Sequence, residues 1–327
     1  MAHYFCTVSA AQNTKAVSAV ALSQDHTFVA VGHVDGCIYL YDLSSPQQPV
    51  RSVHPTTLAG VASGRREGHL TGSRITHLGF VGARHTAIVS VDENGLAFYH
   101  SLGKVLFVEA SDVLRILGKY PEEEEIVAPA AEASLNGQPS PPAKSGKAPI
   151  RRTKWSRQSA SITNMSPLPL GTNPHPTDSY NIIALITTLK LVVVALKPSP
   201  KTWLRRRRGA EDRYAAVMSG ETTPHVGCLA WFPSVSLPND DPESKVSPRI
   251  TLPTLAYSWD KTVQLVTVRE ERVKALPKGE RRNHVEEQGQ LIFEDAGAWV
   301  TDEIVHALHW LNARVRGLHP HDRNIEN

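Results

Sequence analysis

The stretch GHLTGSRITHLGFVGARHTAIVSVDENGLAFYHSLGKVLF (residues 68–107) determines the fold class. After Gly68-His69, alternating apolar residues predict a strand at 75–80, and a second strand is expected at 86–91. A tight turn over DENG (92–95) then leads to a third strand at 96–100. Short strands separated by turns are typical of one propeller blade, a twisted sheet of about four strands. The segment therefore predicts an all-β, WD-repeat-like β-propeller.

The same pattern occurs earlier in the chain. His26 matches His85 and Gly36 matches Gly95, both at an offset of 59 residues. This offset exceeds the usual blade period of ~40–45 residues, and we assign the excess to a polar loop over 44–66. The shared offset indicates a repeat. The strands expected in this first copy are 17–22, 27–31 and 37–41.

Further copies are expected towards the C-terminus. The apolar run at 182–196 predicts two buried strands joined at Thr187-Thr188, and 161–170 predicts an edge strand. A looser third copy contains the wording SWDKTVQLVTV, with Asp260-Lys261 as its turn, and EIVHALHWL (303–311) is expected to begin a fourth. The strands expected in the third copy are 225–232, 254–259 and 262–268.

Domain organisation follows from a break in this pattern. Residues 120–157 are rich in Pro, Glu and Ser, a composition that cannot offset the entropy of ordering, and we expect a disordered loop there. About four blades are expected, at the low end of the ~4–8 in closed propellers. We therefore expect an incomplete propeller, from a fragment or an altered gene model. The predicted parts are first blades at 1–119, the loop at 120–157, further blades at 158–312 and a polar tail at 313–327.

Composition narrows the class of protein. The chain has 327 residues, 41% of them hydrophobic, and a net charge of +3, which by itself does not indicate nucleic-acid binding. Its three cysteines have no zinc-site spacing, so a reduced cytosolic protein is expected. Neither a signal peptide nor a transmembrane segment is expected, because the run at 182–196 has 15 residues and a spanning helix needs ~20.

No motif indicates catalysis. The chain lacks G-x-S-x-G, G-x-G-x-x-G, a Walker loop and H-E-x-x-H, so neither an enzyme nor a cofactor is predicted. His306 and His309 would point to opposite faces of a strand, which disfavours a shared metal. We expect His69 to join a structural hydrogen-bond network with the turn residue Asp92 instead of acting in catalysis.

A basic run follows Pro198-Ser199-Pro200 and surrounds Trp203. One interpretation is a solvated loop that protects a sheet edge from pairing. Contact with anionic phospholipid or an acidic partner is a second, and nucleic-acid binding a third. The basic residues are Lys201, Arg205, Arg206, Arg207 and Arg208.

Two segments carry a family resemblance. ITHLGFVGARHTAIVSVDENGLAFYHSLGKVLFV (75–108) and MSPLPLGTNPHPTDSYNIIALITTLKLVVVALKPSPKTWLRR (165–206) resemble vacuolar protein sorting-associated protein 8 in its fungal form. The resemblance implies an N-terminal propeller of a subunit of CORVET, a complex that tethers endosomal vesicles. In that family a solenoid and a RING-type zinc module follow. This sequence lacks both, so zinc binding is not carried over.

The resemblance implies a non-catalytic scaffold in endosome-to-vacuole protein transport. Its expected partners are tethering-complex subunits and an early-endosomal Rab GTPase in the GTP state, without nucleic acid. The expected location is the cytoplasm, peripherally on endosomal or vacuolar membranes. The alternative is a generic WD-repeat adaptor of another cytosolic complex.

Overall fold

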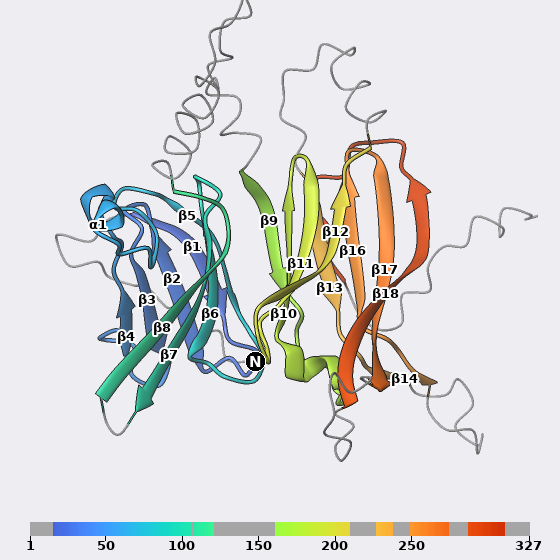
Figure 1. Cartoon of the computed structure of the whole chain (residues 1–327), viewed down its shortest axis with the longest axis horizontal. Coiled ribbons are helices and arrows are strands. Elements are labelled where there is room, and N and C mark those ends of the chain that lie inside the picture. Colours follow the sequence, from blue (N-terminus) through green and yellow to red (C-terminus); the bar gives the residue numbers. More distant parts are fainter. Residues whose placement is uncertain are drawn as a thin grey trace, which may run out of the picture. The chain divides into compact units, whose positions relative to one another are not determined.

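The fold is all-β, as expected. The computed structural model describes residues 16–105, 108–120, 161–209, 227–237, 249–274 and 287–310. They form four four-stranded antiparallel sheets and one two-stranded sheet (Figure 1). Each four-stranded sheet is a meander of the kind that builds one propeller blade. The chain divides into two compact units, Met1–Phe80 with Arg84–Ile162, and Val81–Ala83 with Thr163–Asn327.

The first unit contains two of these sheets, and each matches one predicted copy of the repeat. The glycines at the matching turns, Gly36 and Gly95, have φ values of 91° and 78°, a left-handed conformation that glycine adopts without a steric cost. The two copies therefore share their turn geometry as well as their spacing. The strands are β1 (Val17–Leu22), β2 (Phe28–His33), β3 (Ile38–Asp42) and β4 (Arg51–Val53), then β5 (Ile75–Phe80), β6 (Ala87–Asp92), β7 (Ala97–Val105) and β8 (Val108–Leu117).

The loop predicted over 44–66 is wrong in its central part. It contains strand β4, which pairs with β3 and completes the first sheet, and a short helix, α1 (Leu58–Ala62). Thr57 caps α1, because its hydroxyl accepts a hydrogen bond from the backbone N–H of Gly60. β4 has only three residues, too few for a visible alternation of apolar and polar side chains.

The second unit contains the other two four-stranded sheets. The apolar run at 182–196 forms two buried antiparallel strands, and the segment near 161–170 supplies an edge strand, as predicted. A 3₁₀ helix, η1 (Pro176–Tyr180), precedes the first buried strand. The sheets are β12-β11-β10-β9 and β13-β16-β17-β18, with bounds β9 (Ile162–Pro167), β10 (Ile182–Thr187), β11 (Lys190–Ala195), β12 (Lys201–Arg207), β13 (Cys228–Phe232), β16 (Thr254–Trp259), β17 (Thr262–Lys274) and β18 (Glu287–Val300); β14 (Ser236–Leu237) pairs with β15 (Arg249–Ile250).

The strand predicted at 303–311 is wrong: the described part, up to residue 310, has no strand. The segment instead lies beside β13 and is held by isolated contacts. Trp310 packs on Phe232 with ring centroids 5.0 Å apart, and its Nε1 donates to the carbonyl oxygen of Ala230 at 3.1 Å. Trp310 thus packs against β13 without a ladder of backbone bonds.

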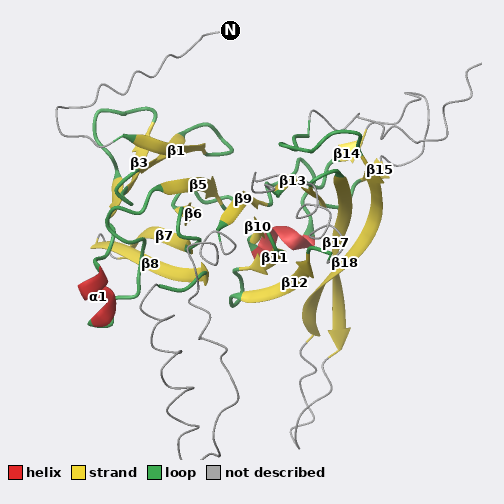
Figure 2. Ribbon diagram, turned by 90° about the horizontal axis from the view of Figure 1, so that it is seen from above, coloured by secondary structure: helices red, strands yellow, loops and turns green. Residues whose placement is uncertain are grey.

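Figure 2 shows the strands in yellow and the few helices in red. Each unit has its own hydrophobic core. In the second unit, alternate residues of β10 and β11 pack against β13 and β16, so Ile186 and Val193 share one cluster with Trp231 and Tyr257. In the first unit, one cluster centres on Phe98 and Tyr120 and another on Leu40 and Ile88. Of the loop predicted to be disordered at 120–157, residues 121–157 lie outside the described residues, as does the polar tail. Its first residue, Tyr120, is instead fully buried in the first unit.

Candidate functional site: a buried network and a basic edge strand

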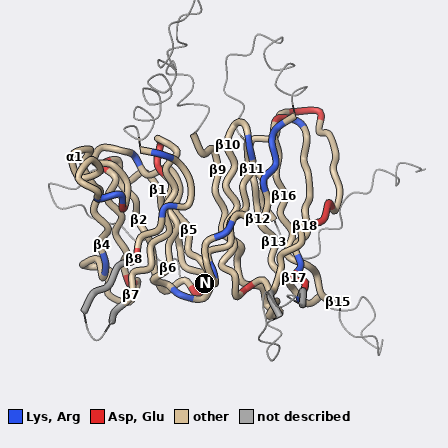
Figure 3. The backbone as a smooth tube through the Cα atoms, in the orientation of Figure 1, with Lys and Arg blue, Asp and Glu red and all other residues tan. Residues whose placement is uncertain are grey.

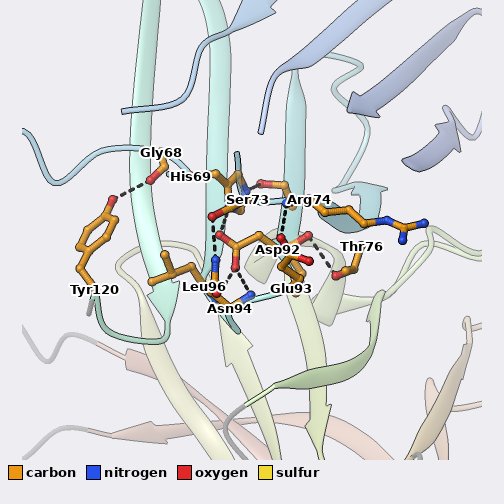
Figure 4. A network of polar contacts seen from close by, with 12 residues as sticks. Gly68, His69, Ser73, Arg74, Thr76, Asp92, Glu93, Asn94, Leu96 and Tyr120 are labelled. Carbon is orange, nitrogen blue, oxygen red and sulfur yellow. Dashed lines mark hydrogen bonds and ion pairs between the residues drawn. The ribbon is translucent and has the colours of Figure 1, made fainter. Parts of the chain in front are cut away.

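A polar network in the first unit joins the loop before β5 to the turn after β6 (Figure 4). His69 Nδ1 lies 2.9 Å from Asp92 Oδ2, and both side chains are fully buried. The other carboxylate oxygen, Asp92 Oδ1, accepts from the backbone N–H of Asn94 at 2.9 Å and of Leu96 at 3.0 Å. Tyr120 donates to the carbonyl oxygen of Gly68 at 2.6 Å, which holds the start of the loop. Asp92 therefore sets the turn and anchors the loop.

The network continues inward through Ser90. Ser90 Oγ lies 2.6 Å from His69 Nε2 and 2.7 Å from His100 Nε2. Because a carboxylate only accepts, His69 donates from Nδ1, and in a neutral imidazole its Nε2 then accepts from the hydroxyl of Ser90. The serine oxygen then accepts from His100 Nε2. Protons are thus ordered in one direction, from His100 through Ser90 and His69 to Asp92.

His100 ends this chain with one ring nitrogen that makes no hydrogen bond. It is fully buried, and its Nδ1 has no hydrogen-bond partner. Burial, and to a lesser extent the neighbouring His69, lower the pKa of His100 to about 3. The imidazole is therefore neutral at physiological pH. A neutral Nδ1 carries a lone pair and no proton, which costs less to bury than a charge.

Ser90, His69 and Asp92 have the order of a serine-hydrolase triad, but their burial argues against that chemistry. A nucleophile must meet a substrate carbonyl, and Ser90 is 0% exposed. Its oxygen is also occupied by His100. The arrangement fits a structural role, which we propose for His69 and Asp92.

The sequence prediction placed His69 with Asp92 but missed Ser90, His100 and Tyr120. A signal existed for Ser90, since residues two apart on a strand share a face, which places it with Asp92 on β6. His100 required the register of β6 with β7, in which it lies opposite Ile88. Nothing local to Tyr120 indicated its bond to Gly68, 52 residues away.

One interpretation placed the basic run in a solvated loop, and this is wrong. The run forms most of β12, which is the edge strand of its sheet. Arg206 pairs with Asp295 on β18 and also donates to the hydroxyl of Tyr257 at 3.0 Å. Arg208, which is buried just beyond the strand, forms an ion pair with the partly buried Asp260. These two arginines connect β12 to the neighbouring sheet. The strand shows no regular apolar alternation, because Arg206 meets the neighbouring sheet through an ion pair where an apolar side chain would otherwise pack.

The remaining basic residues of the run lie apart from those ion pairs. Arg205 and Arg207 are exposed, and Lys190 of β11 lies directly opposite Arg207. At the other end of β12, Lys201 places its Nζ 3.8 Å from the centre of the Trp203 ring. Lys and Arg positions are blue in Figure 3. The structure thus divides the five predicted residues among three environments.

Two kinds of feature concern the part of the chain that the structure describes, namely metal-ligand groups and membrane-spanning helices. No group of three His, Cys, Asp or Glu residues there could hold a metal ion. His306 and His309, considered for a metal, lie in the segment beside β13. Among the described helices, none has the length and apolar character needed to cross a membrane.

The meander sheets define the chain as a β-propeller protein. Comparison with known families then gives a particular one: the family described as Vps8 beta-propeller matches residues 3–318. The chain belongs to this family. The membership supports a protein-interaction scaffold, and propeller scaffolds of this kind are generally non-catalytic.

Two solved propellers show a weak overall likeness. The Cps50 (Swd1) β-propeller domain of Myceliophteria thermophila has 8% identity and a TM-score of 0.36, over 84% of this chain and 57% of that one. Sqt1 of Saccharomyces cerevisiae has 10% identity and a TM-score of 0.38, over 78% of this chain and 46% of that one. The chain thus spans about half the length of these two. No curated protein matches the sequence.

Proposed function

We propose that this chain is the propeller part of a non-catalytic tethering subunit, acting in endosomal vesicle tethering and in protein transport to the vacuole. The observation that carries the proposal is the family match over residues 3–318. A propeller suits this task because its stable sheets present loops that are free to vary and to bind partners. In this proposal the blades belong to the parts at 1–119 and 158–312, on either side of the Pro-rich segment.

The proposed partners are an early-endosomal Rab GTPase in its GTP state and the other subunits of the CORVET tethering complex. The protein would then act peripherally on endosomal and vacuolar membranes. Neither nucleic acid nor a cofactor is part of this proposal. The network around Asp92 contributes by fixing the loop and turn at one end of its sheet.

Calorimetry with the purified chain tests the Rab proposal. An early-endosomal Rab is loaded with a non-hydrolysable GTP analogue or with GDP, and a Golgi Rab in the same two states serves as control. We expect binding to the GTP form of the endosomal Rab alone. Absence of binding in every state, together with co-purification of the chain with an unrelated complex, would favour the WD-repeat adaptor.

A further inference from the structure

Three cations meet at one end of β11 and β12, and we call Lys190, Arg205 and Arg207 the basic cluster. Lys190 lies opposite Arg207, and Val192 lies opposite Arg205, in the antiparallel register. Directly opposed residues share a face of the sheet, so the three side chains project on the same side. Arg205 and Arg207 are exposed and Lys190 is half-buried. The cluster is therefore a solvent-facing patch on an edge strand.

Within the described residues, no acidic side chain pairs with any member of the basic cluster. The contrast with the other face of β12 is sharp. Arg206 pairs with Asp295 and Arg208 with Asp260. Along the run from Arg205 to Arg208, alternate arginines are thus neutralised on one side of the sheet and keep their positive charge on the other.

The uncompensated charge has a cost inside the fold. The pKa of Lys190 is lowered by burial first, and then by the positive charges of Arg205 and Arg207. Each lowering reflects a penalty on the charged form of the lysine. An anion that contacts the basic cluster would remove part of this penalty, so the cluster is arranged to favour an external negative charge.

We propose that the basic cluster binds the phosphate groups of anionic phospholipids at a membrane surface. Guanidinium groups match phosphate oxygens in a two-point geometry, and the lysine adds a point charge. Residues two apart on a strand are separated by ~6.5–7 Å, so Arg205 and Arg207 reach separate phosphates. The cluster lies on an exposed edge strand, which suits a flat array of headgroups better than one enclosed ion.

Vesicle flotation of the purified chain tests this proposal independently of any Rab. One set of vesicles contains phosphatidylcholine alone, and the other contains added phosphatidylserine. The test variant is R205Q/R207Q. The matched control is R65Q/R84Q, which removes the same charge from exposed arginines of the first unit. We expect the wild type and the control to float only with anionic vesicles, and the test variant to bind about 30-fold more weakly.

Stability measurements keep the result interpretable. Because removing like charges relieves repulsion, R205Q/R207Q should melt at or slightly above the wild-type temperature. Equal loss of flotation in both variants would overturn the proposal, since net charge alone would then explain it. Failure of the wild type to bind anionic vesicles would also overturn it. So would full competition by inorganic phosphate, or binding of polyglutamate in place of vesicles, because the ligand would then be a free anion or an acidic protein segment.

Discussion

The buried imidazole of His100 connects the stability of the first unit to pH. Its pKa is about 3 in the folded chain, against an ordinary 6.5. Between these values the unfolded chain binds the additional proton, so stability is lost as the pH falls from 6.5 towards 3. We predict that this group alone removes about 2 kcal/mol of unfolding free energy between pH 7 and pH 5.

Urea unfolding at the two pH values measures this term. The variant His100→Gln cannot titrate but keeps an amide N–H that can donate to Ser90. The pH-dependent loss should therefore be smaller in the variant by about 2 kcal/mol. The same loss in both proteins would show that His100 is not the titrating group.

The carboxylate of Asp92 accepts three hydrogen bonds of the buried network, more than the carboxylate of the neighbouring turn residue Glu93. Its truncation leaves two backbone N–H groups and His69 without an acceptor in a site that water does not reach. We predict that Asp92→Ala costs about 3 kcal/mol in unfolding free energy. Glu93→Ala is the control, because Glu93 is exposed and accepts one bond, from the backbone N–H of Arg74. Similar losses for the two variants in urea unfolding would contradict the assigned role.

At the residue scale, sequence reasoning reached partners that a turn pattern specifies. Asp92 precedes a glycine turn, and a Gly-His pair lies upstream, so His69 could be placed with it. Ser90 and His100 complete the network only through strand register, which a single sequence does not reveal. The turn pattern also did not reveal that these side chains are buried, which is the reason for assigning them a structural role.

Arg205 in β12 and Arg208 just beyond its end should contribute very differently to stability. Arg208 is 6% exposed and pairs with Asp260. The substitution Arg208→Ala therefore removes this ion pair from the Asp260 carboxylate. We predict a loss of about 3 kcal/mol in urea unfolding. Arg205→Ala should change stability by less than about 0.5 kcal/mol, since its side chain is exposed. Equal effects would mean that the ion pair does not connect the two sheets of the second unit.

At the element scale, strands were predictable where apolar side chains alternate or run together, as in β5, β10 and β11. Strand β12 was not predicted, because ion pairs with the neighbouring sheet replace apolar contacts on part of its inner side. For residues 303–310 the error was the reverse. A strand was predicted from their apolar pattern, but the segment lies beside β13 without backbone pairing. Periodicity reports which side chains are covered, and both strands and packed coil can cover them.

At the scale of the whole molecule, the fold was predictable from repeated turns, and the family from the wording of two segments. Composition contributed little to either. Gly36 and Gly95, which are 59 residues apart, both have a left-handed backbone conformation at the corresponding turn of their sheets. Partner surfaces were not predictable, because blades share a scaffold pattern while exposed side chains vary with function.

Two buried cysteines allow the two compact units to be followed separately. Cys37 lies in the first unit and Cys228 in the second, and both are buried thiols that form no disulfide. Burial raises the pKa of Cys228 to about 11, which keeps its thiolate scarce at pH 8 until the surrounding core opens. Labelling of each cysteine against urea, assigned by mass spectrometry in a Cys6→Ser background, therefore reports the opening of its own unit.

Because each unit has its own core, destabilisation should stay within the unit that carries the substitution. We predict that Asp92→Ala lowers the urea midpoint for labelling of Cys37, and that Arg208→Ala lowers the midpoint for Cys228. With a loss of about 3 kcal/mol and a urea slope of about 1–3 kcal/mol/M, each shift should be about 1–3 M. If either substitution moves both midpoints by the same amount, the two units unfold as one cooperative structure, and the cores are coupled in stability.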